Sequence, residues 1–94
     1  MDKAEARQLA VGKARELRAM PWAELRDRFL RNSETVEIAG PSGTAYQVKM
    51  HAVWDGKKDV DLRVFVEVDD GGWRAFVPLS ESFIIAPDGS FVGE

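Results

Sequence analysis

The sequence predicts a two-layer α+β protein, with one or two N-terminal helices packed on an antiparallel β-meander of four to six strands. Apolar residues recur at helical spacing up to about residue 32, and from residue 35 onward they alternate with polar residues. The 94 residues, 45% hydrophobic and 31% charged, have the composition of one folded domain, 1–94. We expect a helical segment over 1–32 and an antiparallel sheet over 35–94.

Two helices are predicted on either side of Pro21. The first runs from about residue 2 to residue 19, with Asp2 as its N-cap and Glu5 three residues later completing a capping box. The second starts at Pro21, because proline is accepted in the first turn of a helix, and continues to about residue 31. Whether the two helices are continuous stays open. Their expected contribution to the core is Leu17, Met20, Trp22, Leu25 and Phe29.

The first hairpin is predicted around the segment GPSG, residues 40–43. A three-residue loop, Pro41-Ser42-Gly43, places a glycine where a left-handed residue is needed. This loop pairs Ile38 with Tyr46 and Val36 with Val48. The second strand then continues with alternating apolar residues to Trp54.

A second hairpin is predicted around DDGGWRAF, residues 69–76. Alternation begins at Val60, and Asp70-Gly71 has the composition of a two-residue type I′ turn. With that turn, Leu62 faces Leu79, Val64 faces Val77 and Phe65 faces Phe76. The helices should then cover the face formed by Ile38, Val48, Met50, Val64, Val66, Trp73 and Val77.

The opposite face of the sheet is the predicted interaction surface. Two adjacent aromatic side chains on a face away from the helices need a covering group, because exposed apolar patches often mark interfaces. Either the C-terminal segment 83–94, with its own turn at Pro87-Asp88-Gly89, covers them, or a partner does. The residues of this expected interaction face are Phe65, Phe76, Arg63, Arg74, His51 and Lys49.

Charge and reactive residues are distributed in a way that argues against several kinds of function. Residues 1–33 hold eight Lys/Arg and five Asp/Glu, whereas residues 34–94 hold five and eleven. The sheet half is therefore acidic, which disfavours nucleic acid as a partner. With one histidine and no cysteine there is no set of transition-metal ligands, and no motif of a catalytic site is present. We predict no catalytic residues, no metal site, no cofactor and no enzymatic activity.

These observations favour a small protein-interaction module, with self-association into a homodimer through the exposed sheet face as one form of it. A first alternative is a domain that binds a small apolar ligand between helices and sheet, near Trp22, Trp54 and Trp73. A second is single-stranded nucleic-acid binding on the Phe65/Phe76 face. No apolar run reaches the roughly 20 residues that a membrane span needs, and the cysteine-free composition fits a reducing compartment. We therefore expect a cytoplasmic protein with a protein partner and no membrane contact.

Overall fold

The structure, a computed structural model, describes residues 2–71 and 78–94. The described residues form two helices and one four-stranded antiparallel sheet with the strand order β1-β2-β3-β4. The elements are α1 (Lys3–Arg18), α2 (Trp22–Phe29), β1 (Glu34–Ala39), β2 (Ala45–Trp54), β3 (Leu62–Asp69) and β4 (Leu79–Ile85). The predicted α+β class is confirmed.

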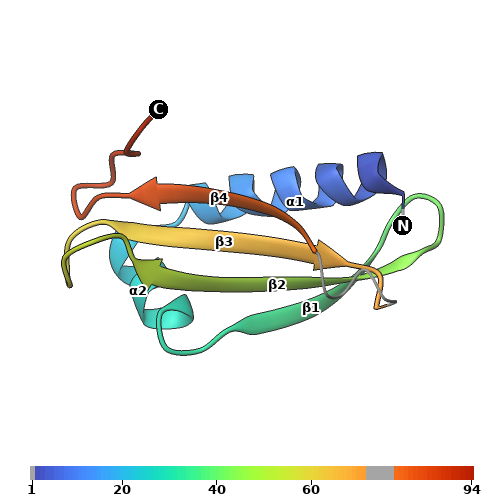
Figure 1. Cartoon of the computed structure of the whole chain (residues 1–94), viewed down its shortest axis with the longest axis horizontal. Helices are drawn as coiled ribbons and strands as arrows, with labels where there is room; N and C mark the ends of the chain where they lie inside the picture. The colour runs from blue at the N-terminus through green and yellow to red at the C-terminus, as the bar shows by residue number, and fades with distance from the viewer. Residues whose placement is uncertain (1, 72–77) are drawn as a thin grey trace.

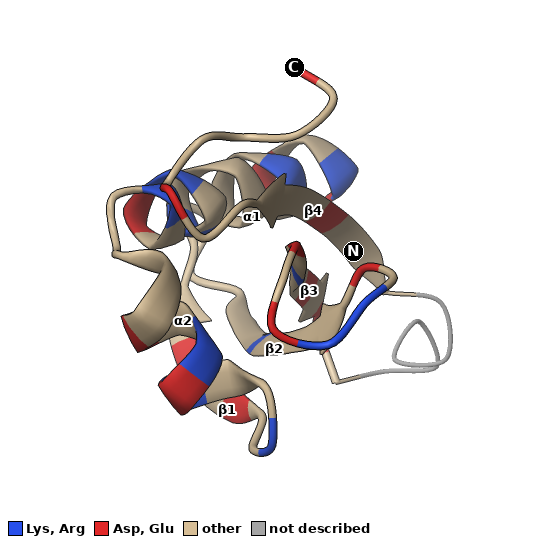
Figure 2. Cartoon of the chain, turned by 90° about the vertical axis from the view of Figure 1, so that its left-hand side faces the viewer, with Lys and Arg blue, Asp and Glu red and all other residues tan. Residues whose placement is uncertain are grey.

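Both helices lie on one side of the sheet, so the described molecule has two layers. In Figure 1 the helices lie behind the strands, with α1 against β3 and β4 and α2 against β2 and β3. Figure 2 shows the same arrangement from the end, with the helices on one side and the strands on the other. The face of the sheet that packs on the helices is called the inner face below, and the opposite face is called the outer face.

The inner face and the helices share one apolar core. Every second residue of β2 and β3 is buried, and alanines on α1 let the helix lie close to the sheet. Burial of this apolar surface is the main stabilising contribution to the fold. The buried apolar residues are Ala6, Ala10, Ala14, Leu17, Leu25, Phe29, Tyr46, Val48, Met50, Ala52, Leu62, Val64, Val66, Val68, Phe83 and Ile85.

The N-terminus of α1 is capped as expected, but the capping box is not completed. The Asp2 carboxylate accepts a hydrogen bond from the Glu5 N–H at 3.1 Å. The Glu5 carboxylate instead accepts from the Ser42 hydroxyl at 2.8 Å and from the Ser42 N–H at 3.3 Å. It can do so because Gly40 has no Cβ where the Glu5 carboxylate lies. The Asp2 part of the predicted capping box is confirmed. The Glu5 part was wrong, because the Glu5 side chain binds Ser42 of the first hairpin instead of the start of its own helix.

The two helices are separate, and the second is shorter than predicted. The Ala19 N–H donates to the Glu16 carbonyl and the Met20 N–H to the Leu17 carbonyl at the end of α1, and Pro21 has an extended conformation before α2 begins at Trp22. The helix ends at Phe29, with Leu30 as its C-cap, and does not reach residue 31.

The first hairpin agrees with the prediction residue by residue. Ile38 pairs with Tyr46 and Val36 with Val48. Gly43 has φ 88°, the left-handed conformation that the three-residue loop requires. The Gly40 N–H closes the loop onto the Thr44 carbonyl at 2.9 Å.

The predicted register of the second hairpin was wrong. Leu62 pairs with Ile85 instead of Leu79, Val64 with Phe83 instead of Val77, and Phe65 with Ser82. The predicted and observed registers differ by an even number of residues, so both keep the same side chains on the inner face. The alternation of apolar and polar residues fits both registers equally and cannot decide between them. In the observed register two large side chains of β4, Phe83 and Ile85, are buried, with exposed fractions of 4% and 2%.

Two further differences concern the start of β3 and the C-terminal segment. The strand begins at Leu62, because Asp59 has φ 65° in the loop and Val60 is 41% exposed. Within 83–94, the first three residues complete β4, and the chain turns at Pro87-Asp88-Gly89 and returns along the sheet edge. The Val92 N–H donates to the Ile84 carbonyl at 2.9 Å.

The returning segment packs at the end of α1. Phe91 pairs with Ile85, contacts the ring of Phe83 edge-on at 5.8 Å, and joins the core from the helix side. Arg18 lies over both phenylalanine rings and forms an ion pair with Glu94 at 2.6 Å. The segment therefore covers the inner face at the end of β4.

Candidate functional site

The outer face carries the predicted interaction residues that the structure describes. Within residues 2–71 and 78–94, both helices lie on the other side of the sheet (Figures 1 and 2). The described outer-face residues are Thr35, Glu37 and Ala39 on β1; Ala45, Gln47, Lys49, His51 and Val53 on β2; Arg63, Phe65, Glu67 and Asp69 on β3; and Ser80, Ser82 and Ile84 on β4.

The centre of the outer face is a stack of two rings. His51 and Phe65 are cross-strand partners, and their ring centroids lie 4.9 Å apart at an interplanar angle of 15°. Among residues 2–71 and 78–94 the buried Nδ1 atom of His51 has no hydrogen-bond partner, and the stack with Phe65 is the ring contact of this side chain there. On its other side Phe65 faces Ser82. The predicted Phe65–Phe76 pair is excluded by this register, and Phe76 itself lies outside the described residues.

An apolar patch surrounds Arg63 at one end of this face. Arg63 lies between Val53 and Ile84 in the strand register, and Val53 is 44% exposed. The guanidinium donates to the Asp55 carboxylate at 3.0 and 3.2 Å. This ion pair fixes the Arg63 side chain across the patch. Arg74, the other predicted arginine of this face, lies outside the described residues.

The opposite end of the outer face is acidic. Glu67 lies across from Lys49, and Asp69 and Glu37 flank Gln47. The described part of the face thus holds three carboxylates and two cations. Along β3 the order is positive at Arg63, aromatic at Phe65 and negative at Glu67 and Asp69. This distribution of charge gives no continuous basic track for phosphates, which single-strand binding would need.

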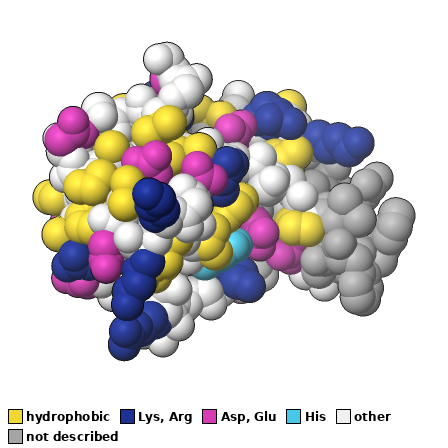
Figure 3. All heavy atoms as spheres, turned by 60° about the vertical axis from the view of Figure 1, so that its left-hand side comes forward, with side chains coloured by type: hydrophobic (Ala, Val, Ile, Leu, Met, Phe, Trp, Pro, Cys, Tyr) yellow, Lys and Arg dark blue, Asp and Glu magenta, His cyan; other side chains and the backbone are white. Residues whose placement is uncertain are grey.

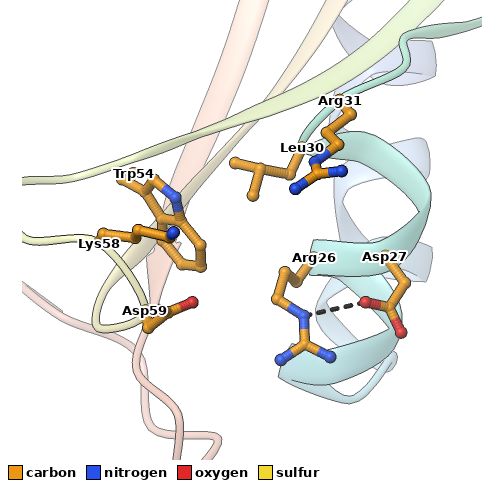
Figure 4. Close-up of a pocket in the computed structure, with 7 residues that line it drawn as sticks. All are labelled: Arg26, Asp27, Leu30, Arg31, Trp54, Lys58 and Asp59. Atoms are coloured by element: carbon orange, nitrogen blue, oxygen red, sulfur yellow. Dashed lines mark hydrogen bonds and ion pairs between the residues drawn. The ribbon is translucent and has the colours of Figure 1, made fainter.

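A second candidate region lies at the end of the molecule where α2 meets the β2–β3 loop. Trp22 and Trp54 contact each other here, with centroids 5.9 Å apart and planes inclined by 38°. Trp73, which we grouped with them, lies outside the described residues. Beside Trp54 is a hollow of about 540 Å³. Figure 4 shows its lining residues, Arg26, Asp27, Leu30, Arg31, Trp54, Lys58 and Asp59.

The lining of this hollow is mostly charged. Arg26 donates to Asp27 at 2.9 Å, and this hydrogen bond raises the pKa of the Arg26 guanidinium. Sequence reasoning identified the tryptophans but missed the charged residues, because α2 and the β2–β3 loop are joined only by tertiary packing. The signal in the sequence was weak: basic residues at the end of the helical segment, and two lysines in a polar loop near Trp54.

A third group of polar side chains joins α1 to the first hairpin. Glu5, only 9% exposed, binds Ser42 as described, and the Thr44 hydroxyl lies 3.0 Å from Ser42 Oγ, which can accept its hydrogen bond. The Tyr46 hydroxyl is buried in the same region. Burial raises the pKa of the Tyr46 phenol, and the adjacent Glu5 carboxylate raises it further. We interpret this group as a structural contact that anchors the hairpin.

The described residues contain no group of three or more His, Cys, Asp or Glu side chains arranged to hold a metal ion. No helix in that part of the chain combines the length and apolar character needed to cross a membrane. Comparison of the chain with protein-family models, curated proteins and solved structures finds no match. The functional argument therefore depends on the geometry of the outer face and of the hollow.

Proposed function

We propose that this protein is a protein-interaction module that forms a homodimer by packing two outer faces together. The observation that carries the proposal is the charge order along β3, positive at Arg63 and negative at Glu67 on either side of Phe65. A two-fold axis across the strands at Phe65 places Arg63 of one copy opposite Glu67 of the other, twice. The face is therefore complementary to itself, as a two-fold interface requires.

The same axis brings the aromatic centres together. Each His51–Phe65 stack then meets the stack of the second copy, and sheet faces that pack this way lie about 10 Å apart. The flanking apolar side chains, Val53 and Ile84, are covered at the same time. We extend the proposal to a cytoplasmic location, which the absence of cysteine favours.

The size of the face limits the affinity. Four strands about 4.8 Å apart and roughly seven residues long span about 19 by 23 Å. This footprint of about 440 Å² is below the roughly 600–1,000 Å² per partner of specific, stable interfaces. We therefore expect a dimer with a micromolar dissociation constant.

The test exploits the paired charges. Arg63→Glu and Glu67→Lys each place like charges opposite one another in a homodimer, so each variant alone should be monomeric. In an equimolar mixture both contacts join opposite charges again, because the two substituted positions face each other in one contact and the unchanged Arg63 and Glu67 face each other in the second. A mixed dimer should therefore form. Light scattering coupled to size-exclusion chromatography over micromolar concentrations measures the mass. Glu24→Lys, on the exposed surface of α2, is the matched control and should dimerise like the wild type.

Stability and a third variant keep the result interpretable. Arg63→Glu also breaks the contact with Asp55, so its thermal unfolding is measured first. If it does not fold, Glu67→Lys and Phe65→Ser still test the interface, and both should be folded monomers. A wild-type protein that is monomeric throughout the concentration range overturns the proposal. So does a dimer that persists in all three variants.

A further inference from the structure

Hydrogen bonds tie together the two walls of the hollow, α2 and the β2–β3 loop. The Trp22 indole N–H donates to the Val60 carbonyl at 2.9 Å, which ties the helix to the loop. The loop is closed at its base by the Asp55 N–H bonding to the Asp61 carbonyl at 2.8 Å. Trp54 is held between them by its contact with Trp22. A site whose walls are fixed before binding loses less entropy when a ligand enters.

Positive charge enters the hollow from both walls. Arg31 extends from the end of α2 and Lys58 from the loop, and Figure 4 shows both side chains directed toward the space between them. Within the described ranges neither side chain forms an ion pair, whereas Asp27 is already bonded to Arg26. An anion placed between Arg31 and Lys58 therefore needs to displace no existing ion pair. Figure 3 brings this end of the molecule forward and shows Lys and Arg side chains gathered on its lower part.

An aromatic and an aliphatic surface complete the site. The Trp54 ring forms one wall and Leu30 lies across from it, so a flat ring has an apolar surface to pack on. Asp59 offers a carboxylate acceptor at the rim for a hydroxyl or N–H of the ligand. The volume of about 540 Å³ lies within the range of small-molecule sites, about 300–1,000 Å³.

We propose that this hollow binds a small aromatic anion, with its ring against Trp54 and its carboxylate or phosphate between Arg31 and Lys58. The ligand class differs from the apolar ligand that the tryptophans alone predict, because five of the seven lining residues are charged. The site is separate from the outer face. A protein that proves monomeric would therefore leave the ligand proposal unaffected, and a failure to bind ligand would leave the dimer proposal unaffected.

Calorimetric titration with four probes tests the chemistry of the ligand. Benzoate and adenosine monophosphate combine a ring with an anion, adenosine has the ring alone, and inorganic phosphate has the anion alone. At least one of the first two should bind saturably, with adenosine and phosphate weaker by about tenfold or more, since each lacks one of the two contacts. Phosphate binding as tightly as the aromatic anions would reduce the site to a simple anion site and overturn the proposal. No saturable binding of either aromatic anion at millimolar concentration would also overturn it.

Charge-reversal variants locate the binding. Lys58→Glu and Arg31→Glu change exposed side chains and should leave the thermal unfolding temperature nearly unchanged. Each should weaken binding of the aromatic anion by about tenfold or more, because the anion then meets a carboxylate. Lys57→Glu is the matched control: it is the neighbouring exposed lysine of the same loop but does not line the hollow. Its affinity should stay within about twofold of the wild type, and an equal loss in Lys57→Glu would indicate a general effect of charge and not a site.

Discussion

The two faces of the sheet belong to the same strands but differ in composition and in burial. On the inner face nearly every side chain of β2 and β3 is apolar and buried, and the packing of the helices leaves little room for change. On the outer face apolar, aromatic and charged side chains alternate, and their exposure ranges from half-buried to exposed. Burial determines the composition of the inner face. The outer face is less constrained by folding, and its charge order is therefore more informative about binding.

The strongest test of this difference compares two phenylalanines on adjacent strands. Phe83→Ala removes a buried ring from the inner face and should cost about 3–5 kcal/mol of unfolding free energy. Phe65→Ala removes a half-buried ring from the outer face and should cost at most about 1.5 kcal/mol. Urea unfolding in dilute solution, where dimerisation does not contribute, measures both. Equal losses would show that the outer face is covered as the inner face is.

A smaller effect is expected where α1 meets the first hairpin. In Gly40→Ala the new Cβ takes the space of the Glu5 carboxylate, which must leave Ser42, at a cost of about 1–3 kcal/mol. Ser42→Ala removes the same hydrogen bond from the other side. The double variant should therefore lose clearly less than the sum of the single losses. Additive losses would show that Gly40 acts independently of this contact.

Tyr46 carries a titratable hydroxyl among the buried residues that the structure describes on the inner face, and it gives that face a dependence on pH. Because burial raises its pKa in the folded state, the neutral phenol favours folding. Its contribution is complete below the unfolded pKa of about 10 and is lost as the pH rises through the folded pKa.

Tyr46 is also the only tyrosine of the chain, so ultraviolet absorbance of the tyrosinate reports this single group. The titration should be displaced to a pH above about 10. The fall of stability at alkaline pH should be less steep in Tyr46→Phe. An identical alkaline fall in both proteins would contradict the burial argument.

The smallest effect is expected for a polar contact of the outer face. Gln47 donates to the Glu37 carboxylate at 3.0 Å, and this bond is exposed to solvent. Gln47→Thr should change the unfolding free energy by no more than about 0.5 kcal/mol, because water replaces the lost partner. The same urea titration measures it. A loss near that of Gly40→Ala would show that this part of the outer face is covered.

The difference between the two hairpins shows what the sequence can predict. The pairing of Ile38 with Tyr46 followed from a short loop with a required left-handed glycine, and such a loop leaves one register. The pairing of Val64 with Phe83 did not follow, because Asp70-Gly71 resembled a tight turn and alternation tolerates even shifts. Register could be predicted where a turn fixes it, and not where burial of residues farther along the chain decides it.

The same limit applies to the candidate sites. Parity placed Lys49, His51, Arg63 and Phe65 together on the outer face, and the structure brings these four residues together. Parity could not predict that Phe65 pairs with Ser82, because this pairing depends on the register. The hollow was more difficult to predict from the sequence, since Arg31 and Lys58 come to line one hollow only through the packing of α2 on the sheet.

The position of α1 against β3 and β4 has a consequence during synthesis of the chain. The surface that α1 needs is complete only after Ile85 has been added, which at about 5–20 residues per second takes on the order of several seconds after the helix is made. Until β3 and β4 have been made, the apolar stripe of α1 lacks the strands that it packs against. The stripe consists largely of Ala6, Ala10 and Ala14, which offer little surface for unwanted association. An alanine-rich first helix thus suits a chain in which the earliest element must wait for strands made much later.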